Sequence, residues 1–147
     1  MRICGVDISG SDAVITLLGY ENGLFDIPDC RARQLSLSAT GDQEAVKRFR
    51  ATFAKLVDDY RVDTVAIRQR PHKGKFAGSA VGFKMEALIE LLDCSVTLIS
   101  PTDIKEQIKR NPLPIDFAET GLKKFQEQAF MTAYAKLNQT IYSSSSD

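Results

Sequence analysis

Residues 62–67, with the sequence VDTVAI, place the strongest constraint on the fold of this chain. The run is short and apolar enough to predict a strand that is buried on both faces. Helical patterns lie before and after it, and this alternation is typical of an α/β sheet covered by helices. The strand runs directly into RQRPHKGK, residues 68–75, so a buried element is followed at once by a concentration of positive charge.

The first third of the chain predicts antiparallel strands. Residues 2–8 and 13–20 are apolar runs, and the turn formers SGSD lie between them at residues 9–12. These patterns predict a hairpin with a turn of four or more residues. Residues 24–27 or residues 33–38 supply a third strand, after a turn at Asn22 and Gly23.

Helices and strands then alternate. The sequence TGDQ at residues 40–43 fits a capping box before a helix whose apolar stripe runs from Val46 to Tyr60. A second stripe, from Val81 to Leu92, precedes a strand at residues 95–99, and Ser100 and Pro101 fit the N-cap and first residue of a third helix. A last helix is expected to carry on one face Leu122, Phe125, Ala129, Ala133 and Leu137.

The predicted fold is therefore α/β, with a mixed β-sheet flanked by helices. A chain of 147 residues can bury a sufficient core as one domain, assigned to residues 1–142, and the Ser-rich residues 143–147 are expected to be a disordered tail.

The composition excludes several classes of protein. Nineteen basic and nineteen acidic residues give no net charge, so binding to a polyanion requires a local patch. Cys4, Cys30 and Cys94 are odd in number and lack metal-ligand spacing, which predicts reduced thiols and a cytoplasmic location. No signal peptide and no apolar run of membrane-spanning length is present, so we expect no membrane association.

The order of elements, with Asp7 on the first strand, resembles the ribonuclease H-like superfamily, and within it the RuvC-type Holliday-junction resolvases. The resemblance is carried by ICGVDISGSDAVITLL as the opening hairpin, VAIRQRPHKGKFAGSAVGFKMEALIELL as the fourth strand with its loop and helix, VTLISPTDIKEQI as the fifth strand, and FQEQAFMTAYA in the final helix. The whole chain is also similar to the small bacterial groups of this superfamily that have no assigned function.

This resemblance implies a site built from carboxylates that hold two divalent metals, Mg²⁺ or Mn²⁺. Asp7 matches the first carboxylate and would be the metal ligand if a divalent site survives. Arg68 fills the position of the acid on the fourth strand. On the last helix the two expected acids fall on Lys124 and Glu127, so Glu127 is the second catalytic candidate, and Glu119 is a fallback that requires the helix to begin early.

Arg68 is costly in such a site. Replacing an anion by a cation about 5 Å from a bound dication costs roughly 13 kcal/mol at an effective dielectric constant near 20, or about nine decades of affinity. We therefore expect the two-metal site to be lost or impaired. One hypothesis is that the Arg68 guanidinium lies beside Asp7 in the place of a metal.

The basic segment is the second candidate site. Its predicted phosphate-binding residues are Arg68, Arg70, His72, Lys73, Lys75 and Lys84. Gly74 and Gly78 would allow close approach of a phosphate, and Phe76 could stack on a base. The competing interpretation is a solvated loop without a ligand.

These features leave several functions open. The first is a nucleic-acid-binding protein, for branched or single-stranded DNA or RNA, that lacks two-metal catalysis. The alternatives are a metal-dependent nuclease that uses Asp7 and Glu127, and a protein-interaction module. An actin-like ATPase is disfavoured, because its nucleotide lies between two such lobes and 147 residues cover one. The resemblance also implies a homodimer, since RuvC-type enzymes act as dimers, although no interface residue is identified.

Overall fold

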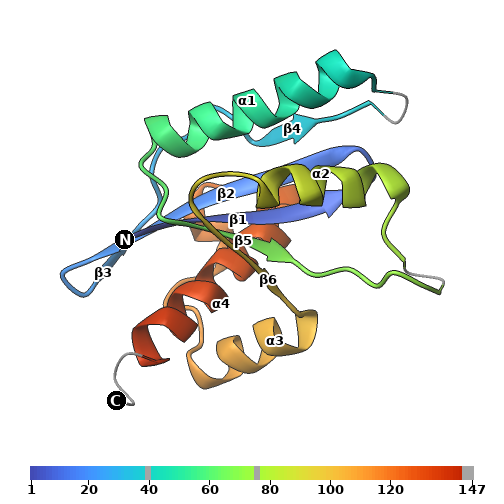
Figure 1. Cartoon of the computed structure of the whole chain (residues 1–147). Helices are drawn as coiled ribbons and strands as arrows, with labels where there is room; N and C mark the ends of the chain where they lie inside the picture. Colours follow the sequence, from blue (N-terminus) through green and yellow to red (C-terminus); the bar gives the residue numbers. More distant parts are fainter. Residues whose placement is uncertain (39–40, 75–76, 144–147) are drawn as a thin grey trace.

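The computed structural model describes residues 1–38, 41–74 and 77–143. In this part of the chain, six strands form one mixed sheet with the order β3-β2-β1-β5-β6, and β4 pairs with β2 beside β3. The α/β fold with a mixed sheet flanked by helices is thereby confirmed (Figure 1). The predicted domain assignment and the predicted tail, of which residues 144–147 lie outside the described residues, stay predictions.

Strands β1 (Arg2–Ser9) and β2 (Asp12–Glu21) form the opening hairpin. The turn is tighter than predicted, because Ser9 pairs directly with Asp12 and only Gly10 and Ser11 remain between them. Gly10 makes this two-residue turn accessible with a φ of 59°, a left-handed conformation that favours glycine.

Both candidate third strands exist, and both pair with β2. Strand β3 (Leu24–Asp26) pairs with the end of β2 at residues 19–21, and β4 (Gln34–Ser36) pairs with its beginning at residues 12–14. The outer edge of β2 therefore has a gap between its two partners.

Strand β5 (Thr64–Arg68) lies parallel to β1 on one side and parallel to β6 (Ser95–Ile99) on the other. Its residues Val65, Ala66 and Ile67 are fully buried, as the apolar run predicts. Because β1, β5 and β6 are parallel, their carboxyl ends meet at one edge of the sheet, where Asp7 and Arg68 lie.

Helices α1 (Gln43–Asp59) and α2 (Ala80–Glu90) cover one face of the sheet. The predicted cap of α1 was misplaced, since Asp42 is its N-cap and accepts a hydrogen bond from the Ala45 amide, whereas Thr40 lies outside the described residues. Helix α3 (Pro101–Arg110) begins as predicted, with the Ser100 side chain accepting from the Asp103 amide.

Helix α4 (Glu127–Ser143) covers the opposite face, with α3 beside it (Figure 1). It starts later than predicted. Leu122 lies in the loop before it, Phe125 is half exposed in the short 3₁₀ helix Lys124–Gln126, and Glu119 lies in the 3₁₀ helix Phe117–Thr120. The helical stripe is therefore continuous only through Ala129, Ala133 and Leu137.

The cysteines agree with the sequence, which predicts reduced thiols. All three cysteines are free thiols, and Cys4 is fully buried, which raises its pKa far above the usual range. None of the helices in the described ranges is both long and apolar enough to cross a bilayer.

The contact of α4 with β1 depends on Gly5. A Cβ atom at this position would collide with the carbonyl oxygen of Ala129 and would lie 2.8 Å from the Cβ of Ala133. The backbone of the helix cannot move aside as a flexible side chain can. Gly5 therefore permits the closest approach between the last helix and the sheet.

We predict that Gly5→Ala destabilises the fold by about 3 kcal/mol through overpacking, measured as the free energy of unfolding in urea. Gly19→Ala on the neighbouring strand is the matched control, because its Cβ would meet only the exposed Asp26 carboxylate. Equal losses for the two variants would contradict the role assigned to Gly5.

Candidate functional site

Asp7 and Arg68 lie on neighbouring strands at the carboxyl edge of the sheet. The parallel register pairs Gly5 with Ala66 and Val6 with Ile67, so the next positions along the two strands are those of Asp7 and Arg68. Gly5 and Ala66 face α4, and the alternation of strand side chains puts Asp7 and Arg68 on that same face. Both side chains are half-buried.

The Asp7 carboxyl has an unusual electrostatic environment. Burial raises its pKa above the ordinary value of 3.8, and the positive charges of Arg68 and then Arg70 partly offset this rise. No hydrogen bond or ion pair of the described residues joins Asp7 to Arg68. The hypothesis that Arg68 lies beside Asp7 therefore agrees with the register, but a direct bond between the two groups is absent.

Glu127, the second predicted catalytic acid, has a different partner. It is the first residue of α4, and its carboxylate accepts a hydrogen bond of 3.0 Å from Lys124. In the described part of the chain, no three His, Cys, Asp or Glu side chains come together as a metal-binding group. The charges acting on Asp7 are arginines, so this set of side chains does not fit the carboxylate cluster that two divalent metals require.

Arg70 is buried against α2, although the sequence predicts an exposed phosphate-binding residue. Its side chain is only 8 % exposed and packs against α2, with the guanidinium carbon 4.5 Å from the centroid of the Phe83 ring. The carboxylate of Glu86, itself 10 % exposed, lies 3.6 Å from Nη2 of Arg70. Arg70 is therefore directed into the protein and does not present its guanidinium to a ligand in solvent.

Two glycines make room for this guanidinium. A Cβ at Gly78 would lie 2.6 Å from Nη1 of Arg70, and one at Gly82 would collide with the same atom. Gly78 therefore accommodates an arginine, where the sequence predicts close approach of a phosphate. Gly74 has a φ of 94° and open space around it.

Glu86 is the residue that sequence reasoning missed. Residues 64–85 contain no Asp or Glu, and Glu86 is the next residue along the chain. It lies in the segment from Val81 to Leu92, whose apolar stripe predicts a core helix. The sequence feature that could have indicated Glu86 is its spacing from Gly82, one helical turn away on α2. This spacing places a carboxylate next to a gap that can hold a guanidinium.

The remaining basic residues are placed as follows. Lys73 and His72 are exposed, and the His72 ring packs edge-on against Phe83 with 4.6 Å between centroids. Lys84 is exposed on α2, and Lys75 and Phe76 lie outside the described residues. Of the described cations in the basic segment, Lys73 and Lys84 are therefore exposed to solvent, and Arg68 lies half-buried at the end of β5.

A hollow of about 480 Å³ lies beside this loop. It is lined by Gln69, Arg70, Pro71, His72, Lys73 and Pro101. None of the described residues that line it is acidic, and the first residue of α3 forms part of its wall. Such a surface suits an anionic group.

The buried ion pair yields a prediction. Arg70→Met should destabilise the protein by about 3–5 kcal/mol, because Glu86 is left as an uncompensated buried charge. The double variant Arg70→Met/Glu86→Leu should recover most of this loss, since Nε and Nη2 of Arg70 and Oε2 of Glu86 make no hydrogen bond in the described structure. Urea unfolding of the two single variants and the double variant measures the coupling, and additive losses would contradict it.

The burial of Asp7 yields another prediction. Since its pKa is raised in the fold, the ionised carboxylate costs stability at neutral pH, and this cost disappears below the ordinary pKa of 3.8. Asp7→Asn should therefore raise the urea midpoint at pH 7 and lose this advantage as the pH falls towards 4. The control is Asp116→Asn, at an exposed residue whose side chain makes no capping hydrogen bond. A less stable Asn variant at pH 7 would show that Arg68 and Arg70 outweigh the burial.

Comparison with solved structures identifies the fold. RuvC of Thermus thermophilus superimposes with a TM-score of 0.69 at 15 % identity over 97 % of each chain. The same protein in complex with Holliday junction substrate gives 0.68 at 12 % identity over 97 % of this chain and 96 % of that one. The Fowlpox virus resolvase bound to Holliday junction DNA gives 0.50 at 15 % identity over 96 % and 99 %. The resemblance to RuvC-type resolvases is thus confirmed for the fold, which at this identity is all that it shows.

Comparison of the sequence itself gives one family. No curated protein matches the chain, whereas the family described as "Protein of unknown function (DUF3010)" matches residues 1–136. This match covers most of the sequence, including Asp7, the basic segment and the first turns of α4, and the chain therefore belongs to the DUF3010 family.

Proposed function

We propose that this protein binds the phosphate backbone of DNA or RNA at the carboxyl edge of its sheet, and that it does so without two-metal cleavage. The observation that carries the proposal is the environment of Asp7. The charges that act on this carboxyl are Arg68 and Arg70, where a two-metal nuclease needs further carboxylates.

The segment after β5 and the adjoining helix α2 support binding of a polyanion. Lys73 and Lys84 are exposed, and none of the described residues that line the hollow beside the loop is acidic. Lysine contacts to phosphate fix the position of a nucleic acid without reading its sequence. Two of the similar structures contain Holliday junction DNA, which favours a branched DNA as the first ligand to test.

Arg70 acts indirectly in this proposal. Its buried guanidinium holds the segment after β5 against α2 through Phe83 and Glu86. The same contact keeps His72 next to Phe83 and leaves Lys73 outside. Arg70 is therefore a positioning residue of the loop, and the direct phosphate contacts belong to Lys73, Lys84 and Arg68.

We predict salt-sensitive binding to duplex, single-stranded and four-way-junction DNA, measured by fluorescence anisotropy with labelled DNA. Two to four phosphate contacts give a slope of about −2 to −3.5 for log affinity on duplex against log salt. Lys73→Glu/Lys84→Glu should weaken binding to all sequences alike. The matched control, Lys55→Glu/Lys109→Glu, reverses two exposed lysines outside the basic segment, one in α1 and one in α3.

The same tubes, with and without Mg²⁺ and Mn²⁺, test the absence of cleavage. Intact DNA in all of them is the expected result. Metal-dependent cleavage that Asp7→Asn abolishes would establish the nuclease alternative with Asp7 and Glu127. Equal binding by the two double variants would remove the loop from the proposal, and no binding by the unmodified protein would leave the protein-interaction module as the function to test.

A further inference from the structure

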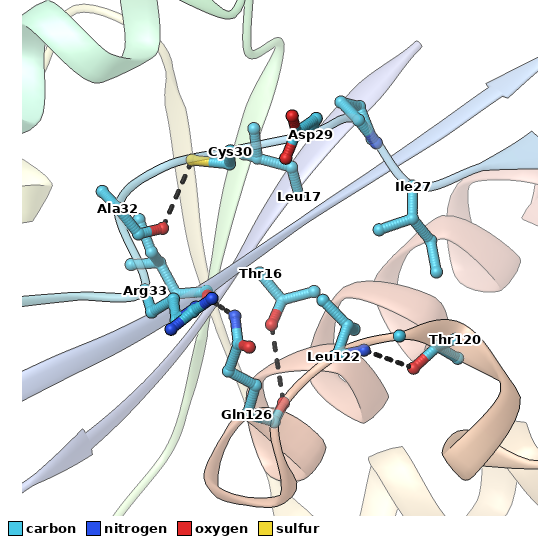
Figure 2. Close-up of a pocket in the computed structure, with 13 residues that line it drawn as sticks. Thr16, Leu17, Ile27, Asp29, Cys30, Ala32, Arg33, Thr120, Leu122 and Gln126 are labelled. Atoms are coloured by element: carbon cyan, nitrogen blue, oxygen red, sulfur yellow. Dashed lines mark hydrogen bonds between the residues drawn. The ribbon is translucent and has the colours of Figure 1, made fainter.

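A second site lies on the outer edge of β2, in the gap between β3 and β4. A pocket of about 220 Å³ occupies this gap. Figure 2 shows the loop between β3 and β4, with Ile27, Asp29, Cys30 and Ala32, on one side of the pocket, and Thr120, Leu122 and Gln126 on the other. None of these residues belongs to the site at Asp7.

The backbone of Leu17 faces into this pocket. In the hairpin, the even-numbered residues of β2 exchange backbone hydrogen bonds with β1, as Tyr20 does with Met1. The odd-numbered residues therefore direct their amide and carbonyl groups away from β1. At one end of the gap, the Ile15 amide donates to the Arg33 carbonyl. At the other end, Gly19 pairs with Asp26. Leu17 is the odd-numbered residue between them.

Leu17 has no hydrogen-bond partner for these outward groups among the described residues. Its neighbour Ile15 differs, because the Gln126 side chain donates a hydrogen bond of 3.0 Å to the Ile15 carbonyl (Figure 2). Leu17 itself is only 2 % exposed. Because the amide and carbonyl of Leu17 face the pocket and have no partner among the described residues, they can bond to a molecule that enters it.

The shape of the pocket limits what that partner can be. Strands β3 and β4 pair with β2 on either side of Leu17, so an additional extended strand cannot lie along this edge. The volume is below the roughly 300–1,000 Å³ of pockets for drug-sized ligands. The space therefore suits one small planar group that carries a hydrogen-bond donor and acceptor side by side.

We infer that this pocket binds a nucleobase that carries an N–H next to a C=O, as uracil, thymine and guanine do, through the backbone of Leu17. The Leu17 amide donates to the base carbonyl, and the Leu17 carbonyl accepts from the base N–H. Ile15, Leu17 and Ile27 supply apolar contacts for the ring, and the exposed Arg33 at the rim can meet an attached phosphate. The base could belong to a free nucleoside or to a nucleic acid strand with an unpaired base.

The test uses the ¹⁵N-labelled full chain and ¹H–¹⁵N spectra during titration with uridine. A saturable downfield shift of the Leu17 amide is the expected result, since a new hydrogen bond forms there. N3-methyluridine, which lacks the donor, should bind roughly tenfold more weakly. Equal affinity for uridine and the methylated nucleoside would overturn the inference.

A variant and an oligonucleotide complete the test. Ala32→Phe fills the pocket and should abolish the Leu17 shift while other amides keep their positions, and Ala51→Phe on the exposed face of α1 is the control. A single-stranded oligouridine that shifts Leu17 when uridine does not would assign the site to strands. Failure of both ligands would overturn the inference, and it would leave the proposed loop untouched because Lys73→Glu/Lys84→Glu tests that loop separately.

Discussion

The close contact of α4 with β1 at Gly5 is the constraint on which the rest of this structure depends. Ile3 packs in one cluster with Leu137, and Gly5 meets Ala129 and Ala133, so the helix runs antiparallel to the strand. Asp7, two residues further along the same face, therefore lies level with the first turn of α4. The close approach also places Gln126, just before the helix, where it can bond to the Ile15 carbonyl. One glycine thus positions the helix start for both candidate sites.

The carboxyl edge of the sheet is arranged around arginines. Arg70 pairs with Glu86 at a distance of 3.6 Å that is too long for a hydrogen bond, and Asp7 is half-buried without a direct partner among the residues that the structure describes. A chain selected only for stability would replace these groups by apolar side chains of the same volume, because buried ion pairs seldom repay their desolvation. Their presence where the fold brings strand ends together therefore points to a function that needs charge at this edge.

The sequence predicts the elements well where the signal is local. Apolar runs locate β1, β2, β5 and β6, and the Ser100-Pro101 pair locates the start of α3. The errors arise where two local signals compete. Asp42 rather than Thr40 caps α1 because its side chain accepts from the Ala45 amide. The predicted last helix was extended too far because Leu122 and Phe125 continue its apolar spacing although both precede its first residue, Glu127.

The sites are harder to predict because they depend on contacts between distant residues. Arg70 reads as one more cation of a solvated loop, and only the packing of α2 shows that Gly78, Gly82 and Glu86 enclose it. The Leu17 pocket has no side-chain signal at all. It results from the register of three strands and from a loop of seven residues, 27–33, that leaves a backbone amide and carbonyl unpaired. Asp7, in contrast, is a candidate from the sequence because the resemblance implies a carboxylate on the first strand.

The arrangement of the two sites limits how one ligand can use both. Strand β1 alone separates β2 from β5 in the sheet, so their backbones are about 10 Å apart at equal height. Leu17 lies level with Val65, so Arg68 is displaced further, by three residues along β5. A flexible single strand can cover such a distance with a few nucleotides. A duplex keeps its bases paired, and placing one of them in the pocket costs the free energy of unpairing and unstacking that base. If both sites hold the same molecule, the second contact is intramolecular, and affinity rises steeply once the strand is long enough to reach. Independent sites would show no such threshold, so the dependence of affinity on strand length distinguishes one composite surface from two separate ones.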